Sequence, residues 1–491
     1  MTREILLLLS YVAVTAAIAS ANAEEAAHLL NGGFEQPADA GNIAGWEIRA
    51  NGHKVSVTEE NPATGARSLR IQSASAPRGT LVRQSIPVAA LQRGPLQLHG
   101  RLRTDEVSGS AVMFVVVDGE QGRLFVDDMR DRPVRGTTGW THYTITIPQL
   151  DAAKRAYAGV LLLGAGTAWA DDFRLVAQDN GERMSAEASA YLDNAIDIMA
   201  RRHVNRAAID WNALRDFAHR AASGAQTPRD TWPAIAAAVT RLEDGHSRFA
   251  GPAGNAANAP VAAEVPEIRI HHEMLDMNIG YIEVPSVHAA SGSRTATAYV
   301  DRMHAALETL ADGGACGWIV DLRENTGGTM WPMLAGIGPL AGEGVLGAHV
   351  IPGGERSEWW YRDGRAGIRT GKGERVRSAA SGEVRSVRRE GQAVAVLLSG
   401  NTASAGEAVA IAFEGLEDAR SFGSPTSGLT TANVEVPIGQ GARIILAIAY
   451  SADRTGKTYS GSVTPDHHAA PGAVLDGARR WLASSTACRM R

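Results

Sequence analysis

Cysteine is scarce in this chain, which holds only Cys316 and Cys488 among its 491 residues. Two cysteines exclude a small scaffold that depends on many disulfides. Cys316 lies beside a predicted core strand and Cys488 lies in the C-terminal tail. We therefore expect two unpaired thiols rather than a bridge.

An excess of charge of one sign is also absent. The 48 Lys and Arg residues and 53 Asp and Glu residues give a formal net charge of −5. This balance gives no reason to expect a nucleic acid as a partner. Long apolar runs are missing after the first residues, so we expect no membrane span in the mature chain.

The first residues have the order of a secretory signal peptide: Arg3, an apolar run over 5–18, and the small residues Ala21-Asn22-Ala23. We expect cleavage after Ala23 and an exported protein, periplasmic or secreted. A membrane anchor is the alternative, but the run is shorter than the ~20 residues needed to cross a bilayer. The cleavage site has no cysteine, so a lipid-anchored product is not indicated.

The length predicts roughly three domains, and local patterns place them. Short alternating segments separated by turn residues predict an all-β sandwich over 24–180. The periodicity becomes helical over 181–250, and strands alternate with helices over 264–480, which predicts a small helical subdomain and a C-terminal α/β core. We interpret the arginine-rich stretch at about 352–390 as an insertion. A solvated irregular hairpin is favoured there over a flap that contacts substrate.

The two ends of the sandwich segment read Asn31-Gly32-Gly33-Phe34-Glu35 and Trp169-Ala170-Asp171-Asp172-Phe173. This frame resembles the jelly-roll modules related to carbohydrate-binding domains. The resemblance implies a structural calcium at Glu35 and Asp172, with acidic residues in solvated turns as the alternative. It also offers a glycan as a partner. The tryptophans that could contact a glycan are interpreted as core residues instead: Trp46, Trp140 and Trp169.

Two turns in the C-terminal part contain candidate catalytic residues. Each follows an apolar run, Trp318 to Val320 or Val394 to Leu398, that is typical of a buried parallel strand. The second turn ends at Ser404, which begins an amphipathic helix. Free backbone N–H groups and the helix dipole favour negative charge there, which suits a serine that must generate an oxyanion.

Five short motifs follow one another along this part of the chain. They are Asp244-Gly245-His246-Ser247, Asp321-Leu322-Arg323-Glu324-Asn325-Thr326-Gly327-Gly328, Thr402-Ala403-Ser404-Ala405-Gly406-Glu407, Gly423-Ser424-Pro425-Thr426-Ser427-Gly428 and Val463-Thr464-Pro465-Asp466. In this order they resemble peptidase family S41, which includes tail-specific and C-terminal-processing proteases and the tricorn core protease. The resemblance implies a crotonase-like or ClpP-like core and a serine-type endopeptidase that acts on peptides and needs no cofactor for catalysis. No segment resembles the PDZ domain that many tail-specific proteases carry.

The resemblance makes Ser404 the nucleophile. The family uses a lysine or a histidine as base, and the only lysine after Ser404 is Lys457, far beyond the expected place. The base is therefore assigned to His246, whose imidazole can accept a proton near neutral pH. The family match also implies an oxyanion hole of the Gly328 and Ala405 amides. Simpler alternatives are a capping box of Ser404 with Glu407 and an ordinary histidine at a helix end.

The third member of a triad is missing from its usual place. Histidine-type relatives carry a glutamate shortly before the Val-x-Pro-Asp motif, where this chain has Tyr459 to Ser462. The candidates for orienting the imidazole are Ser460, Asp466, Asp244 and Asp453. Because a wrong tautomer costs several orders of magnitude in rate, a non-catalytic or weakly active peptide-binding protein is one alternative function. A glycan-binding protein is another, which the N-terminal sandwich suggests.

Overall fold

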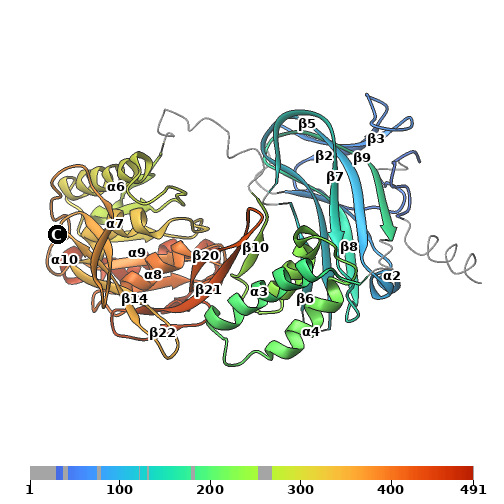
Figure 1. Cartoon of the computed structure of the whole chain (residues 1–491). Coiled ribbons are helices and arrows are strands. Elements are labelled where there is room, and N and C mark those ends of the chain that lie inside the picture. The colour runs from blue at the N-terminus through green and yellow to red at the C-terminus, as the bar shows by residue number, and fades with distance from the viewer. Residues whose placement is uncertain are drawn as a thin grey trace, which may run out of the picture.

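The computed structural model describes residues 29–36, 42–74, 79–120, 122–129, 132–177, 183–252 and 268–489. The predicted signal peptide lies outside these residues. Figure 1 shows a β-rich N-terminal lobe, a C-terminal α/β lobe, and the helices α3 and α4 packed beside the first lobe. None of the helices in the described ranges is long and apolar enough to cross a bilayer.

The N-terminal lobe is the predicted sandwich. Its strands follow the path β1-β4-β8-β5-β9-β3-β2, and β6 and β7 pair with β5. The elements are β1 (Glu47–Arg49), β2 (Lys54–Thr58), β3 (Ser68–Ser73), β4 (Thr80–Ser85), α2 (Val88–Arg93), β5 (Leu96–Asp118), β6 (Arg123–Asp127), β7 (Val134–Ile147), β8 (Arg155–Leu163) and β9 (Gly166–Ala177). The long strand β5 pairs with β9 through its first half and with β8 through its second half.

The tryptophans of the sandwich differ in their surroundings. Trp46 is buried against the rings of Phe34 and Phe173, at centroid distances of 5.0 and 5.6 Å. Trp169 is also buried. Trp140 is only half-buried and donates its Nε1–H to the Asn61 carbonyl at 2.8 Å. The prediction that all three are core residues is confirmed for Trp46 and wrong for the half-exposed Trp140. Trp169 is buried, but beneath Arg103 and outside the apolar cluster of the sandwich.

The helical segment follows its sequence pattern closely. It contains α3 (Ala186–Arg202), α4 (Trp211–Ala221), the 3-10 turn η1 (Pro228–Thr231) and α5 (Trp232–Thr240). Ser185 caps α3 and Asp210 caps α4 by accepting backbone N–H groups. Its buried residues form one continuous apolar cluster with the sandwich and with Ile438, Ile444 and Leu446 of the C-terminal lobe. The helices therefore join the two lobes rather than stand apart from them.

The C-terminal lobe contains two sheets. One has the order β11-β12-β13-β18-β19-β23, parallel except for β11, and the other has the path β10-β21-β14-β15-β16-β17, with β20 and β22 on β21. The strands are β10 (Arg248–Ala250), β11 (His272–Leu275), β12 (Ile279–Glu283), β13 (Gly317–Asp321), β14 (Gly344–Val350), β15 (Arg356–Arg362), β16 (Arg365–Thr370), β17 (Gly373–Ala379), β18 (Val394–Leu398), β19 (Ala419–Gly423), β20 (Thr431–Gly439), β21 (Ala442–Asp453), β22 (Thr458–Tyr459) and β23 (His467–His468). The helices are η3 (Asp276–Asn278), α6 (Arg294–Asp312), α7 (Met330–Ala341), α8 (Ala405–Phe413), η4 (Pro471–Ala473), α9 (Val474–Ala483) and α10 (Thr486–Arg489). This mixed core confirms the predicted alternation of strands and helices.

The arginine-rich insertion is more regular than expected. Its strands β15, β16 and β17 form an antiparallel meander that extends the second sheet from β14. Trp359, Trp360 and Tyr361 are buried. The prediction of a solvated irregular hairpin is therefore wrong, because the aromatic side chains pack inward while the arginines lie largely at the surface.

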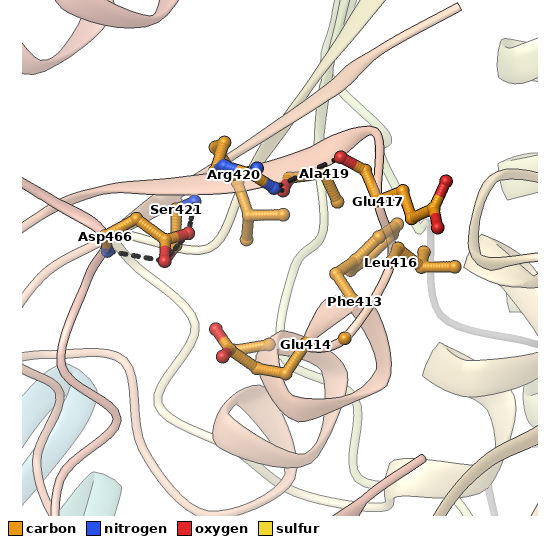
Figure 2. A pocket seen from close by; sticks show the side chains of 11 residues that line it. Phe413, Glu414, Leu416, Glu417, Ala419, Arg420, Ser421 and Asp466 are labelled. Carbon is orange, nitrogen blue, oxygen red and sulfur yellow. Dashed lines mark hydrogen bonds between the residues drawn. The ribbon is translucent and has the colours of Figure 1, made fainter. Parts of the chain in front are cut away.

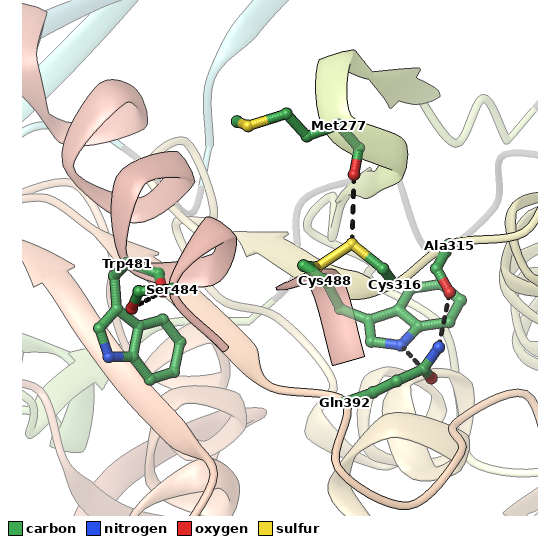
Figure 3. Close-up of a disulfide and its surroundings, with 8 residues drawn as sticks. Met277, Ala315, Cys316, Gln392, Trp481, Ser484 and Cys488 are labelled. Atoms are coloured by element: carbon green, nitrogen blue, oxygen red, sulfur yellow. Dashed lines mark hydrogen bonds between the residues drawn. A yellow bond between two sulfur atoms is a disulfide. The ribbon is translucent and has the colours of Figure 1, made fainter. Parts of the chain in front are cut away.

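Cys316 and Cys488 form a disulfide, so the expectation of two unpaired thiols is wrong (Figure 3). The bridge joins the residue before β13 to the C-terminal helix α10. The preceding helix α9 packs Val474, Ala478 and Leu482 into a cluster with Ile319 of β13. This packing returns the C-terminal tail to the central sheet, a contact that the spacing of the two cysteines does not reveal.

We predict that Cys488→Ser lowers the free energy of unfolding of the C-terminal lobe by about 2–4 kcal/mol, because the bridge closes a long loop in the unfolded chain. Denaturant titration under non-reducing conditions measures this. Reductant should bring the wild type to the level of the variant and leave the variant unchanged. Alkylation of two free thiols in the denatured, unreduced wild type would contradict the bridge.

Candidate active site

Ser404 lies in a sharp turn between β18 and α8. Its backbone has φ 53° and ψ −114°, a conformation that costs energy for a residue with a side chain. The turn is held in place by hydrogen bonds from Ala403 N–H to the Asn325 carbonyl at 3.0 Å and from Ser404 N–H to Glu407 Oε2 at 2.8 Å. A strained residue supported in this way presents its hydroxyl at the start of the helix.

The hydroxyl of Ser404 contacts the imidazole of His246. Ser404 Oγ lies 3.1 Å from His246 Nε2, although 158 positions separate the two residues. The other ring nitrogen, Nδ1, lies 2.9 Å from the Thr431 hydroxyl at the start of β20. The two residues singled out in the sequence are thus brought together at hydrogen-bonding distance, and a threonine that was not predicted completes the chain of contacts.

The backbone of His246 is held by Asp244. Asp244 Oδ1 accepts the N–H groups of His246 at 2.7 Å and Ser247 at 2.6 Å. Its second oxygen, Oδ2, lies 2.6 Å from Nε2 of the buried His203. The strand that follows, β10, pairs with β21. Asp244 therefore positions the loop that carries His246 and does not contact the ring of His246.

Burial is the main influence on the protonation of the site. It lowers the pKa of His246, with a smaller opposite effect from the Asp244 carboxylate. Burial acts to raise the pKa of Asp244, but hydrogen bonds from His203 and Ser247 outweigh it and lower that pKa. The site therefore combines a neutral imidazole with a nearby carboxylate that stays ionised.

The glycine turn packs directly against Ser404. Gly327 and Gly328 have φ of 103° and 122°, which disfavour other residues. A Cβ at Gly327 would lie 2.9 Å from the Cβ of Ser404 and 3.3 Å from the Ala405 nitrogen. At Gly328 it would lie 2.2 Å from the Val287 carbonyl oxygen. Gly327 thus lets the turn lie against Ser404 and the Ala405 nitrogen, and the oxyanion hole of Gly328 and Ala405 stays a prediction.

Glu407 does more than cap α8. It is fully buried, and besides the Ser404 N–H its carboxylate accepts the Thr426 hydroxyl at 2.5 Å and the Gly428 N–H at 2.8 Å. Burial raises its pKa, although these hydrogen bonds act in the opposite direction. Glu407 therefore fixes the loop at 426–428 to the turn of Ser404, while the hydroxyl of Ser404 points to the imidazole.

The other candidate orienting residues lie elsewhere. Ser460 is exposed, and Asp453 Oδ2 accepts the Tyr459 hydroxyl at 2.9 Å. Asp466 accepts the backbone N–H and hydroxyl of Ser421 at 2.8 and 3.1 Å. It lines a cavity of about 200 Å³ at the opposite end of α8, together with Glu414 and Arg420 (Figure 2). Within the described part of the chain, the side chain that contacts Nδ1 of His246 is that of Thr431.

The residues predicted to hold calcium make other contacts. Glu35 accepts the backbone N–H groups of Ala66 and Arg67. Asp172 lies 3.5 Å from Arg101 Nε. Across the described ranges, no group of three or more His, Cys, Asp or Glu side chains is arranged to hold a metal. Calcium at Glu35 and Asp172 stays a prediction.

Residues 278–469 match the model of peptidase family S41. The chain is 32% identical over 151 residues to the nisin-resistance protein of Lactococcus lactis subsp. lactis. This match covers 30% of the chain, and the chain spans 45% of the length of that relative.

Several solved structures are similar to parts of this chain. A lipoprotein from Streptococcus agalactiae is 21% identical, with a TM-score of 0.48 over 62% of this chain and 99% of that one. The photosystem II D1 C-terminal processing protease is 16% identical, with a TM-score of 0.41 over 62% and 100%. The CBM22-1 xylan-binding domain of Paenibacillus barcinonensis Xyn10C is 16% identical, with a TM-score of 0.25 over 30% and 94%.

The family match includes Ser404 and the glycine turn, and it begins after His246. It also includes Thr431, whose contact with the imidazole no sequence motif indicated. The matched segment, residues 278–469, is similar to peptidase family S41.

Proposed function

We propose that the chain is an exported serine-type endopeptidase that cleaves peptide bonds through an acyl-enzyme on Ser404, with His246 as general base. The observation that supports this most directly is the 3.1 Å separation between Ser404 Oγ and His246 Nε2. A general base must lie within hydrogen-bonding reach of the proton it removes, and this pair does so without any movement. The family match of the surrounding segment supports a peptide as substrate.

The first step is attack of Ser404 Oγ on the peptide carbonyl carbon. The hydroxyl proton passes to His246 Nε2, which requires that nitrogen to be unprotonated beforehand. The neutral ring then carries its proton on Nδ1 and donates it to the Thr431 oxygen 2.9 Å away. The Thr431 hydroxyl can donate as well as accept, so it accommodates the tautomer in which Nε2 is free and does not impose it.

In this proposal the backbone N–H groups of Gly328 and Ala405 donate hydrogen bonds to the carbonyl oxygen as it becomes negatively charged. Removing one such donor in other serine hydrolases costs ~10²–10³ in rate. When the tetrahedral intermediate breaks down, His246 returns the proton to the leaving amine and the acyl group remains on Ser404. Water then attacks the ester, gives its proton to His246, and releases the acid and the free serine hydroxyl.

A weakly active or non-catalytic peptide-binding protein is the second candidate. The observation that favours it is the contact of Nδ1 with a neutral hydroxyl, where a carboxylate would stabilise the imidazolium more strongly. Asp244 supplies negative charge to the region, and it acts to raise the pKa of His246. The two candidates differ in whether turnover is measurable.

We predict that Ser404→Ala lowers proteolysis of casein or a peptide library by about 10³-fold or more and leaves the fold intact. A fluorophosphonate should label the wild type at Ser404 and should not label the variant. Ser460→Ala, a serine at an exposed position, is the matched control and should retain full activity. Equal proteolysis by Ser404→Ala, or labelling at another residue, would exclude the proposed nucleophile.

We predict that Thr431→Val lowers kcat by about 10–100-fold, because the loss of one buried hydrogen bond leaves Nδ1 without an acceptor. Thr431→Ser keeps the hydroxyl and should restore most of the activity. Steady-state kinetics should show the loss mainly in kcat rather than in KM. If Thr431→Val matches the wild type, the threonine does not orient the ring.

We predict an acid limb of kcat/KM with a midpoint below pH 6.5, because burial lowers the pKa of His246 from this ordinary value and the base must be neutral. The positive charge of Arg248 also acts to lower that pKa. Arg248→Gln should therefore move the midpoint to higher pH, whereas Arg248→Lys should leave it in place. A wild-type midpoint above 6.5, or a downward shift in Arg248→Gln, would contradict the role of His246.

A further inference from the structure

One outer face of the sandwich has a row of alternating arginine and tryptophan side chains. Trp169 of β9 lies directly opposite Arg103 of β5 on one side and Arg70 of β3 on the other. The guanidinium of Arg103 lies 3.8 Å from the centre of the Trp169 ring, and that of Arg70 lies 5.6 Å from it. Trp140 of β7 continues the row, 5.7 Å from the Arg103 guanidinium.

More cationic side chains continue along the same face. Side chains two residues apart on a strand share a face, so Arg101 and His99 lie on the side of Arg103. Arg101 is paired with His142, and His99 is paired with Arg174. The side chains of Arg70, Arg101 and Arg174 are 30%, 38% and 57% exposed, so water and a ligand can reach them. We call Arg70, Arg101, Arg103 and Arg174 with Trp140 and Trp169 the arginine face.

The polar groups of the arginine face are incompletely satisfied. Trp169 is 5% exposed, and its Nε1–H has no hydrogen-bond partner. Arg103 Nε and Nη2 also lack partners, and no ion pair involves Arg103 in the described part of the chain. Two carboxylates balance part of the charge: Glu60 lies 3.3 Å from Arg70, and Asp172 lies between Arg101 and Arg174. These unpaired nitrogens are themselves buried, so the groups that can meet a ligand are the exposed parts of Arg70, Arg101 and Arg174. Asp105, two residues after Arg103 on β5, is a third exposed acid on this face, and four arginines against three acids leave a small positive excess.

The mode of contact expected for a neutral sugar is blocked at Trp169. Neutral sugars and nucleobases bind aromatic residues by stacking on an open ring face. Arg103 covers the Trp169 ring, and the ring is almost fully buried. What the face offers instead is planar guanidinium groups, which are suited to bidentate hydrogen bonds with carboxylate, sulfate or phosphate groups.

We propose that the arginine face binds an anionic polysaccharide through its carboxylate or sulfate groups. Charge complementarity supports this ligand class over a neutral glycan. The absence of an open stacking ring at Trp169, and the net charge of −5 of the whole chain, disfavour a nucleic acid. This binding is independent of the proposed peptidase chemistry, because the arginine face lies on the sandwich and Ser404 lies in the C-terminal lobe (Figure 1).

The test is binding of the full chain to polysaccharides of matched size by affinity electrophoresis and calorimetry. The probes are polygalacturonate for carboxylate, dextran sulfate for sulfate, xylan as the neutral polymer and single-stranded DNA. We expect binding to at least one acidic polysaccharide, weakening as salt is added, and none to xylan. Binding of xylan as tight as that of the acidic polymers, preferential binding of DNA, or no binding of either acidic polymer would overturn the proposal.

Variants test whether binding depends on this face or on the overall charge of the protein. Arg101→Gln and Arg174→Gln should each weaken binding by about tenfold, the effect of losing one charge-assisted contact. Arg174 is the safer variant for folding because its side chain is more than half exposed. Arg155→Gln, at an exposed position on β8 of the other layer, removes the same charge and should bind as the wild type. An equal loss in Arg155→Gln, or no loss in Arg174→Gln, would overturn the assignment.

Discussion

The pairing of β10 with β21 is the contact on which the candidate site depends. His246 stands two residues before β10, and this short strand aligns Arg248 with Ile445 of β21. The same strand β21 pairs along its length with β20, which begins at Thr431. A single strand therefore brings the imidazole and its hydroxyl partner into register. Ser404 comes from the other sheet of the lobe, since it lies between β18 of the central parallel sheet and α8.

The parts of the site that are formed by consecutive residues could be predicted from the sequence. The apolar strands β13 and β18, each followed by a tight turn, can be identified from consecutive residues, and Ser404 and Gly328 follow from them. Thr431 could not be found in this way, because it reaches His246 across 185 positions and resembles any threonine at the start of a strand. The helix α7 is hard to predict for a different reason. It contains Pro332 and Pro339 with two glycines, and its burial in the core outweighs their poor helix propensity.

In a serine-protease triad one carboxylate both orients the imidazole and balances its positive charge, and in the proposed mechanism two residues share these tasks. Thr431 contacts the ring and can accept a hydrogen bond from its Nδ1–H. Asp244 supplies the negative charge, but its oxygens are used by backbone N–H groups, the Ser247 hydroxyl and the buried His203. A hydroxyl cannot balance the charge of an imidazolium, and a carboxylate that acts only from nearby balances part of it. In the proposed mechanism the imidazole is therefore oriented by Thr431 but receives weaker electrostatic support than a directly bonded carboxylate would give.

The apolar cluster that the helices share with both lobes affects where the polypeptide can be divided. A fragment cut at the start of the family match, residue 278, would retain Ser404 and lose His246, β10 and α3 to α5. It would also leave Ile438, Ile444 and Leu446 facing water, since these residues pack in the cluster formed with the helices. The segment that matches the family model is therefore smaller than the part of the chain that can fold alone. A fragment that starts at residue 278 is expected to aggregate.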